Sequence, residues 1–171
     1  EERGIPCSGG LPMLVAQARR AAELFTGGSI DPGREEEVLR SLTKQVQNVV
    51  LIGMPGCGKT TVGRALARRL GKRFMDLDEE IVRRWGQPIP DIFASCGEAG
   101  FRAMEAELAG EAGMASGLVI STGGGLVTRR ANYAPLHQNG VIFHLIRDLD
   151  RLPRDGRPLS RGADLEALWR R

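Results

Sequence analysis

Short apolar runs alternate with amphipathic stretches over most of the chain, and this alternation begins near residue 48. Apolar runs occur at 49–52, 118–121 and 141–146, with a shorter candidate at 74–75. The stretches between them have the spacing of amphipathic helices. Strands that alternate with helices predict a parallel sheet covered by helices on both faces. The expected fold class is therefore α/β, as three layers with a central parallel sheet.

The first 46 residues follow a different pattern. Apolar side chains recur on one helical face between residues 11 and 25, and a glycine pair ends that helix. Turn-forming residues come next, and a second short helix follows to about residue 45. We therefore predict two domains: a helical segment with a linker at 1–46, and the α/β domain at 47–171.

The most specific motif follows the first apolar run. Residues 53–60 read GMPGCGKT, a full match to the P-loop pattern G-x-x-x-x-G-K-[ST], placed between a strand and a helix. Inward-facing backbone N–H groups and the helix N-terminus form an anion cradle. Lys59 can reach the β- and γ-phosphates of ATP, and the Thr60 hydroxyl can ligate Mg²⁺. The residues expected at the nucleotide are Gly56, Cys57, Gly58, Lys59, Thr60 and Thr61.

Composition and charge limit which partners and which cellular compartment are expected for the protein. A net charge of +3, spread along the chain, and an aromatic content of 5% argue against a nucleic-acid partner. No apolar run approaches the ~18 residues of a membrane span, so no membrane partner is expected. The three cysteines form no C-x-x-C pair, which favours reduced thiols and a cytoplasmic protein.

Two carboxylates follow the shortest strand candidate. Alternation along a strand would place Asp76 and Asp78 on the same side, at the sheet edge where ligands bind. One could hold a Mg²⁺-bound water near Thr60, while the other accepts a hydrogen bond from a substrate hydroxyl. The alternative is that Asp78 belongs to the acidic first turn of a helix.

Arg102 lies on a predicted helix, with Glu98 four residues before it and Glu105 three residues after it. Two flanking acids could fix its guanidinium for bidentate capture of a carboxylate. The alternative is an ordinary ion-pair network on the surface.

Further along, three glycines at 123–125 follow the strand predicted at 118–121. They either allow backbone contact with a small ligand or form a tight turn.

An arginine-rich loop lies near the end of the chain and contains DGRPL at 155–159. A closing lid that delivers an arginine, here Arg157, could neutralise charge on a transferring phosphoryl group. A solvated basic loop is the alternative. A lid loop beside a P-loop and a parallel sheet predicts a three-layer α/β/α fold of the P-loop kinase type.

Taken in this order, the motifs resemble the shikimate kinase family. The resemblance runs from about residue 47 to residue 171 and rests on GMPGCGKT, DLD, GEAGFR with the following glutamate, STGGG and DGRPL. It implies that Thr60 ligates Mg²⁺ and that Asp76 holds the ion through water. It also implies a shikimate site, whose residues are Asp78, Arg102 on the carboxylate, and the backbone of Gly124.

The reaction implied by this resemblance is transfer of the γ-phosphoryl group of ATP to the 3-hydroxyl of shikimate. The implied catalytic residues are Lys59, Asp78 and Arg157, with Arg157 over the ATP phosphates. Asp78 either orients the hydroxyl or takes its proton. The alternatives are another small-metabolite P-loop kinase, of the gluconate or nucleoside monophosphate type, and a non-catalytic nucleotide-binding module.

The sequence departs from the family pattern in two places. Family members carry a further substrate arginine and a last strand, whereas this sequence ends at Arg171, so the domain is expected to be incomplete at its C-terminus. Cys57 stands in the P-loop where serine or alanine is more usual. Only its backbone N–H is needed by a phosphate, so binding is expected to survive this change.

The N-terminal segment has a resemblance of its own, to the C-terminal end of the shikimate dehydrogenase family. The matching residues are RGIP at 3–6, GLPMLVAQA at 10–18 and ELFTG at 23–27. This resemblance implies that Gln17 would touch shikimate in a complete dehydrogenase, whose catalytic and nucleotide-binding parts this sequence does not contain. We expect the parent protein to be a fusion of two enzymes that catalyse consecutive steps.

Overall fold

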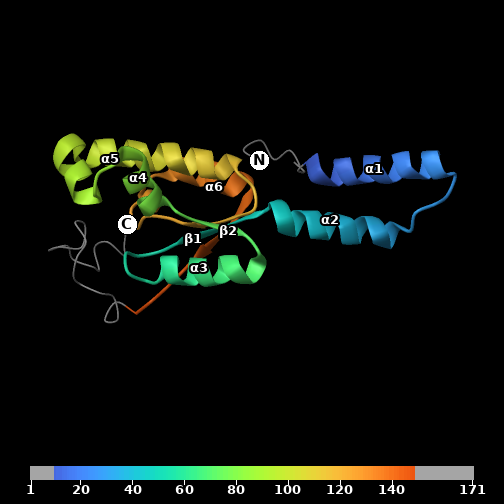
Figure 1. Cartoon of the computed structure of the whole chain (residues 1–171), viewed down its shortest axis with the longest axis horizontal. Helices are drawn as coiled ribbons and strands as arrows, with labels where there is room; N and C mark the ends of the chain where they lie inside the picture. Colours follow the sequence, from blue (N-terminus) through green and yellow to red (C-terminus); the bar gives the residue numbers. More distant parts are fainter. Residues whose placement is uncertain (1–9, 149–171) are drawn as a thin grey trace. The chain divides into compact units, whose positions relative to one another are not determined.

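The computed structural model describes residues 10–148 of the 171-residue chain (Figure 1). The chain divides into two compact units, residues 1–46 and residues 47–171. In the described part of the chain, no helix is long and apolar enough to cross a membrane.

The first unit contains two helices, α1 (Gly10–Thr26) and α2 (Pro32–Val46), as the apolar spacing predicts. Val15 is the buried residue of α1. An ion pair joins the helices, with 2.7 Å between Arg19 Nη1 and Glu35 Oε2. The Ile30 N–H in the connecting turn donates to Glu23 Oε1 at 3.1 Å, which fixes the turn to the end of α1.

The second unit is built on a parallel sheet of four strands in the order β2-β3-β1-β4. The strands are β1 (Asn48–Ile52), β2 (Arg73–Asp76), β3 (Leu118–Ser121) and β4 (Gly140–His144). Val50 pairs with Ile120 of β3 on one side and with Ile142 of β4 on the other. The predicted parallel sheet is therefore confirmed, with each strand within two residues of its apolar run.

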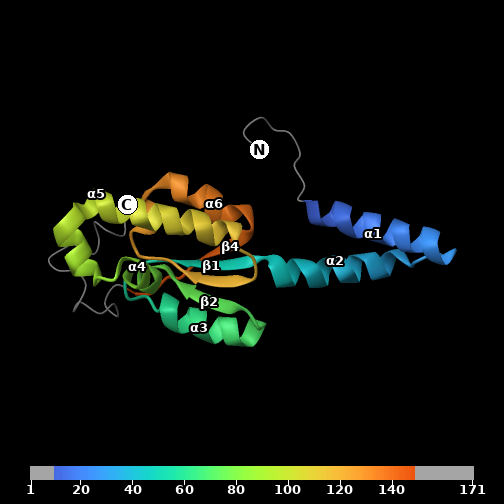
Figure 2. The ribbon, with the colours of Figure 1, turned by 45° about the horizontal axis from the view of Figure 1, so that its top comes forward.

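Helices cover both faces of this sheet, and each face has its own apolar core (Figure 2). On one face, α3 (Lys59–Leu70) packs Ala67 against Leu51 and Val119. The larger core on the other face joins alternate strand residues such as Val50 and Ile120 to three helices. These helices are α4 (Leu77–Trp85), α5 (Ile89–Met114) and α6 (Tyr133–Gln138). The three-layer α/β/α prediction is confirmed, while the predicted lid loop lies outside the described residues.

A break within α5 matters for the site. Gly97 has φ 69° and ψ −177°, so it interrupts the helical backbone in a region that glycine adopts without steric cost. The chain turns there, and Phe93 before the break meets Phe101 after it, with ring centroids 4.5 Å apart. The short segment before Gly97 thereby contributes to the wall of a cavity at the carboxyl ends of the strands.

Candidate active site

The carboxyl ends of the parallel strands meet at one edge of the sheet, and a cavity of about 540 Å³ lies there. The P-loop follows β1, Asp76 ends β2, and the three glycines follow β3. Open α/β sheets bind ligands at this edge, because loops rather than helices cover it. The topology therefore brings motifs that are distant in the sequence to one place.

Most of the sequence-predicted site residues line this cavity. They are Gly56, Gly58, Lys59, Thr60, Thr61, Asp76, Asp78, Arg102 and Gly124. Cys57 is not among the lining residues, and its N–H donates to the Met54 carbonyl at 3.2 Å, within the loop itself. Arg157 lies outside the described residues.

The P-loop has the backbone that its glycines allow. Gly58 has φ 102° and directly precedes α3, so an anion at this point faces the helix N-terminus. Gly53 has φ 144°, and a Cβ built on it would lie 2.4 Å from the Leu145 carbonyl oxygen. The chain after β4 therefore passes directly against the start of the loop.

Lys59 is held across the loop by carbonyl oxygens. Its Nζ donates to the carbonyls of Gly53 at 2.7 Å and Met54 at 3.0 Å, and the residue is only 7% exposed. A buried ammonium needs acceptors, because it cannot keep its water shell. These carbonyls hold the charge at the mouth of the anion cradle, where phosphate oxygens could replace them.

Thr60 and Asp76 form the polar pair expected at a magnesium site. Thr60 Oγ1 donates to Asp76 Oδ2 at 2.7 Å, and Asp76 is almost buried. The other carboxylate oxygen accepts the N–H groups of Asp78 at 3.1 Å and Glu79 at 3.4 Å. One hydroxyl and one fixed carboxylate suit Mg²⁺, which takes one or two carboxylates together with phosphates and water. Among residues 10–148, no cluster of three His, Cys, Asp or Glu side chains offers an all-protein cage.

The expectation that strand alternation aligns Asp76 with Asp78 is wrong. β2 ends at Asp76, which becomes the N-cap of α4, and Asp78 lies in the first turn of that helix. The chain turns here because the Asp76 carboxylate satisfies two N–H groups that a helix start leaves without partners. Both carboxylates still line the cavity. Capping, rather than alternation, brings them there.

Arg102 is buried, so the alternative of an ordinary surface network is excluded. Its Nη1 donates to Glu105 Oε2 at 2.5 Å and its Nη2 to Glu98 Oε1 at 3.3 Å. Arg102 is 7% exposed and Glu105 is 1% exposed. Burial raises the pKa of Glu105, and the hydrogen bond and charge of Arg102 only partly offset this effect. An ionic pair of this kind fixes geometry at the cost of desolvation.

The glycines at 123–125 make room for charged side chains. A Cβ on Gly123 would lie 2.6 Å from Asp78 Oδ1 and 2.6 Å from Glu105 Oε1. A Cβ on Gly125 would lie 2.2 Å from Arg102 Nη1. The three glycines do form a turn, in which the Leu126 N–H donates to the Gly123 carbonyl at 3.3 Å. None of them has a positive φ, so the turn by itself does not require glycine. Close approach to the acids and to the arginine explains Gly123 and Gly125.

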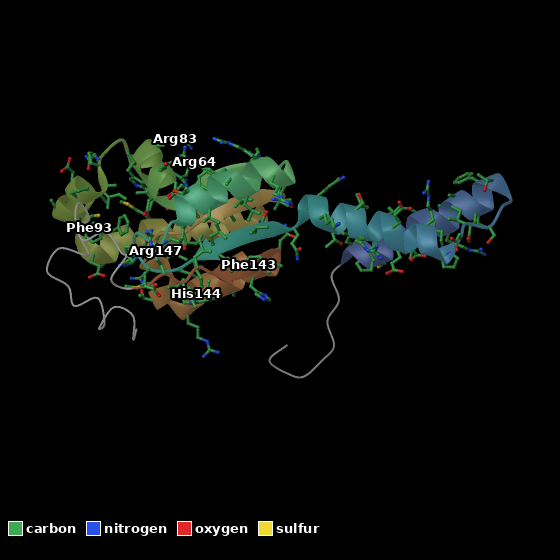
Figure 3. All side chains as sticks on the ribbon, turned by 90° about the horizontal axis from the view of Figure 1, so that it is seen from below. Arg64, Arg83, Phe93, Phe143, His144 and Arg147 are labelled. Carbon is green, nitrogen blue, oxygen red and sulfur yellow. The ribbon has the colours of Figure 1, made fainter. Side chains whose placement is uncertain are left out.

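Some lining residues were not predicted from the sequence. Phe93, labelled in Figure 3, forms an apolar wall together with Phe101. Pro55 lies against Gly124, where an added Cβ would be 2.5 Å from the Pro55 Cγ. Arg147, which follows β4, also lines the cavity. An aromatic on a helix resembles any core residue, and a single arginine after a strand has no local pattern. Only the three-dimensional arrangement identifies them.

The geometry combines an anion cradle, a magnesium-type pair and a buried guanidinium in one cavity. Such an arrangement can hold a nucleoside triphosphate at one end and a small anionic acceptor at the other. The carboxylates of Asp78 and Glu105 both line this cavity close to Gly123. A hydroxyl group bound there would find a hydrogen-bond acceptor beside the phosphate site.

A family model described as "Shikimate kinase" matches residues 55–171. The shikimate kinase of Burkholderia pseudomallei (strain 1710b) is 48% identical over 98 residues, which cover 57% of this chain and 53% of that protein. The shikimate kinase of Pseudomonas putida (strain F1) is 43% identical over 130 residues, which cover 73% of this chain and 76% of that protein.

Among solved structures, the fold is similar to "Shikimate kinase from Acinetobacter baumannii in complex with shikimate". The TM-score is 0.61 and the sequence identity is 41%, over 64% of this chain and 62% of that one. The chain spans about half the length of several curated relatives, including the Burkholderia protein, for which the share is 53%.

Proposed function

The chain belongs to the shikimate kinase family, and we propose on this premise that it transfers the γ-phosphoryl group of ATP to the 3-hydroxyl of shikimate. One observation carries the proposal. The cavity that contains the P-loop also contains a buried arginine, Arg102, fixed by two glutamates and facing a glycine-lined strand end. A carboxylate acceptor and a triphosphate donor fit these two ends.

At the donor end, the backbone N–H groups of Gly56–Thr61 and the ammonium of Lys59 would bind the phosphates of ATP. Lys59 would exchange its carbonyl partners for phosphate oxygens, which are stronger acceptors for an ammonium. Thr60 and Asp76 would hold Mg²⁺, directly and through water respectively. Mg²⁺ would neutralise charge on the phosphates. Within the proposal, the N–H of Cys57 contributes only after leaving the Met54 carbonyl.

At the acceptor end, Arg102 would bind the shikimate carboxylate through the guanidinium edge that its glutamates leave open. Asp78 would accept the hydrogen bond of the 3-hydroxyl, and the backbone of Gly124 would contact the ring substituents. Phosphoryl transfer depends mainly on positioning the two reactants and on stabilising the charge of the transferring phosphoryl group. Rigid placement of Asp78 on the capped start of α4 supports this role.

Arg157 completes the proposal as a lid arginine over the phosphates. This role of Arg157 rests on the sequence alone, because Arg157 lies outside the residues that the structure describes. A nucleoside monophosphate kinase, a gluconate kinase and a non-catalytic nucleotide-binding module remain testable rivals. No contact among the described residues favours one of them.

An ADP-release assay with a panel of acceptors tests the proposed function. We expect ADP release with shikimate, and none with shikimate methyl ester, 3-dehydroshikimate, gluconate or AMP. The methyl ester removes the charge that Arg102 would bind, and 3-dehydroshikimate removes the accepting hydroxyl. A ³¹P spectrum should identify a phosphate monoester at the 3-position. Turnover with AMP or gluconate in place of shikimate would contradict the proposal.

We propose in addition that the first unit derives from the end of a shikimate dehydrogenase-like domain, covalently fused in the parent protein. The support is the sequence resemblance around Gln17 together with the two-helix arrangement of α1 and α2. The coding sequence upstream of Glu1 tests it. A dehydrogenase reading frame continuous with this one is expected, and an unrelated domain there would contradict it.

The proposal also places the enzyme in a reducing, cytoplasmic setting. Cys57 and Cys96 are free cysteines, and Cys57 lies within the phosphate loop. Oxidation at that position would add bulk beside the anion cradle. Fractionation of the native cells is the direct check, with activity expected in the cytoplasmic fraction.

A further inference from the structure

Arg147 lines the cavity, and its guanidinium is available to bind a ligand. The described lining residues carry four carboxylates, from Asp76, Asp78, Glu79 and Glu105, against three cations, from Lys59, Arg102 and Arg147. Arg102 is paired with two glutamates, and the proposed function assigns its remaining donors to the carboxylate of the acceptor. Among residues 10–148, Arg147 is exposed and has no hydrogen bond or ion pair. A polyanionic ligand in this acidic cavity therefore needs the charge of Arg147.

The position of Arg147 is set by the sheet. β4 runs parallel to β1, and Ile52, at the end of β1, pairs with His144. The Leu145 N–H donates to the Ile52 carbonyl at 2.8 Å, so the register continues one residue beyond β4. The Leu145 carbonyl then lies against Gly53 at the start of the P-loop. Arg147 follows two residues later and can be traced from His144 in Figure 3.

We infer that Arg147 binds the phosphate chain of the nucleotide, on the β4 side of the P-loop. The inference rests on the proposed function, in which ATP is the phosphoryl donor. An arginine offers several N–H donors in a planar fork, which suits adjacent phosphate oxygens. Lys59 and the loop N–H groups approach the phosphates from the loop, and Arg147 approaches them from the segment that follows β4.

The test compares Arg147→Ala with the intact protein by displacement of a fluorescent ATP analogue. The three competitors are ATP, inorganic triphosphate and adenosine. A charged hydrogen bond of an exposed side chain corresponds to about a tenfold change in affinity. We expect ATP and inorganic triphosphate to bind about tenfold more weakly, and adenosine to change by less than about twofold. Arg147→Lys, which keeps the charge but loses the fork, should lose less than Arg147→Ala.

Arg130→Ala is the matched control, because Arg130 is also exposed but does not line the cavity. It removes the same charge and should change none of the three affinities by more than about twofold. Equal weakening of all three competitors by Arg147→Ala would overturn the inference, as would no weakening of triphosphate. A loss confined to the KM for shikimate would assign Arg147 to the acceptor instead. Triphosphate displacement needs no acceptor, so failure of shikimate as substrate leaves this result unaffected.

Discussion

Glu105 holds Arg102 inside the protein, with 2.5 Å between the carboxylate and the guanidinium and both residues less than a tenth exposed. Neither partner has enough water around it to be stable alone, so each fixes the other. Glu98 adds a second, more exposed partner at 3.3 Å. The pair therefore positions a cation that can still offer donors to the cavity.

Replacing Arg102 with lysine tests the role of the planar fork. Arg102→Lys keeps the charge but cannot reproduce two parallel hydrogen bonds. We expect shikimate affinity to fall by ~1.5–3 kcal/mol, the scale of a charged hydrogen bond, with ATP affinity nearly unchanged. Titration calorimetry with each ligand measures both. Equal losses for the two ligands would show that Arg102 supports the fold rather than the acceptor.

The raised pKa of Glu105 predicts a pH dependence of stability. Burial, the largest effect, raises this pKa above the ordinary value of 4.5, so the folded protein holds the proton more tightly than the unfolded chain does. The stability due to Glu105 is thus present below pH 4.5 and is lost as the pH rises through the folded pKa. Urea unfolding between pH 4 and pH 8 measures this loss.

Glu105→Gln provides the comparison, because the amide keeps the shape but does not titrate. The free energy of unfolding of the intact protein, relative to this variant, should fall as the pH rises above 4.5 and then level off. A difference that rises with pH would mean that attraction to Arg102 outweighs desolvation. The present assignment of the larger effect would then be wrong.

The sequence predicted the strands and the P-loop well because local pattern determines both. Apolar runs specify buried parallel strands, and the loop needs glycines at fixed spacing before a lysine. The position of Asp78 was missed because Asp-Leu-Asp fits both an alternating strand and a capped helix start. Only the hydrogen bonds of the Asp76 carboxylate decide between these two. Phe93 and Arg147 were missed because their roles depend on the Gly97 break and on the register of β4.

Removal of the P-loop ammonium tests the donor end. Lys59→Met keeps the aliphatic stem and removes the charge that the Gly53 and Met54 carbonyls now hold. Preorganised charge at a developing phosphoryl transition state is worth about 10²–10³ in kcat, so ADP release should fall by that factor or more. The circular dichroism spectrum should be unchanged. Wild-type ADP release from a folded variant would contradict the assignment of the P-loop to catalysis.

Two glycine-to-alanine substitutions compare a site where an added Cβ would collide with a neighbour and a site where it would meet nothing. A Cβ at Gly125 would collide with the Arg102 guanidinium, the nearest atom lying 2.2 Å away, whereas a Cβ at Gly110 in α5 would meet nothing within 4 Å. Gly110→Ala should therefore stabilise the protein by about 0.5–1 kcal/mol, the helical preference for alanine over glycine. Gly125→Ala should destabilise it by about 1–3 kcal/mol, the scale of overpacking, and displace Arg102 from its glutamates.

Thermal unfolding and shikimate titration distinguish the outcomes of this pair. We expect Gly125→Ala to lose shikimate affinity while triphosphate binding at the P-loop persists, because the displaced arginine lies at the acceptor end. The φ of Gly125 is −98°, which alanine adopts without strain, so any loss comes from the collision and not from the backbone. If Gly125→Ala binds shikimate as the intact protein does, the glycines are not what keeps room for Arg102, and the acceptor site must be reassigned.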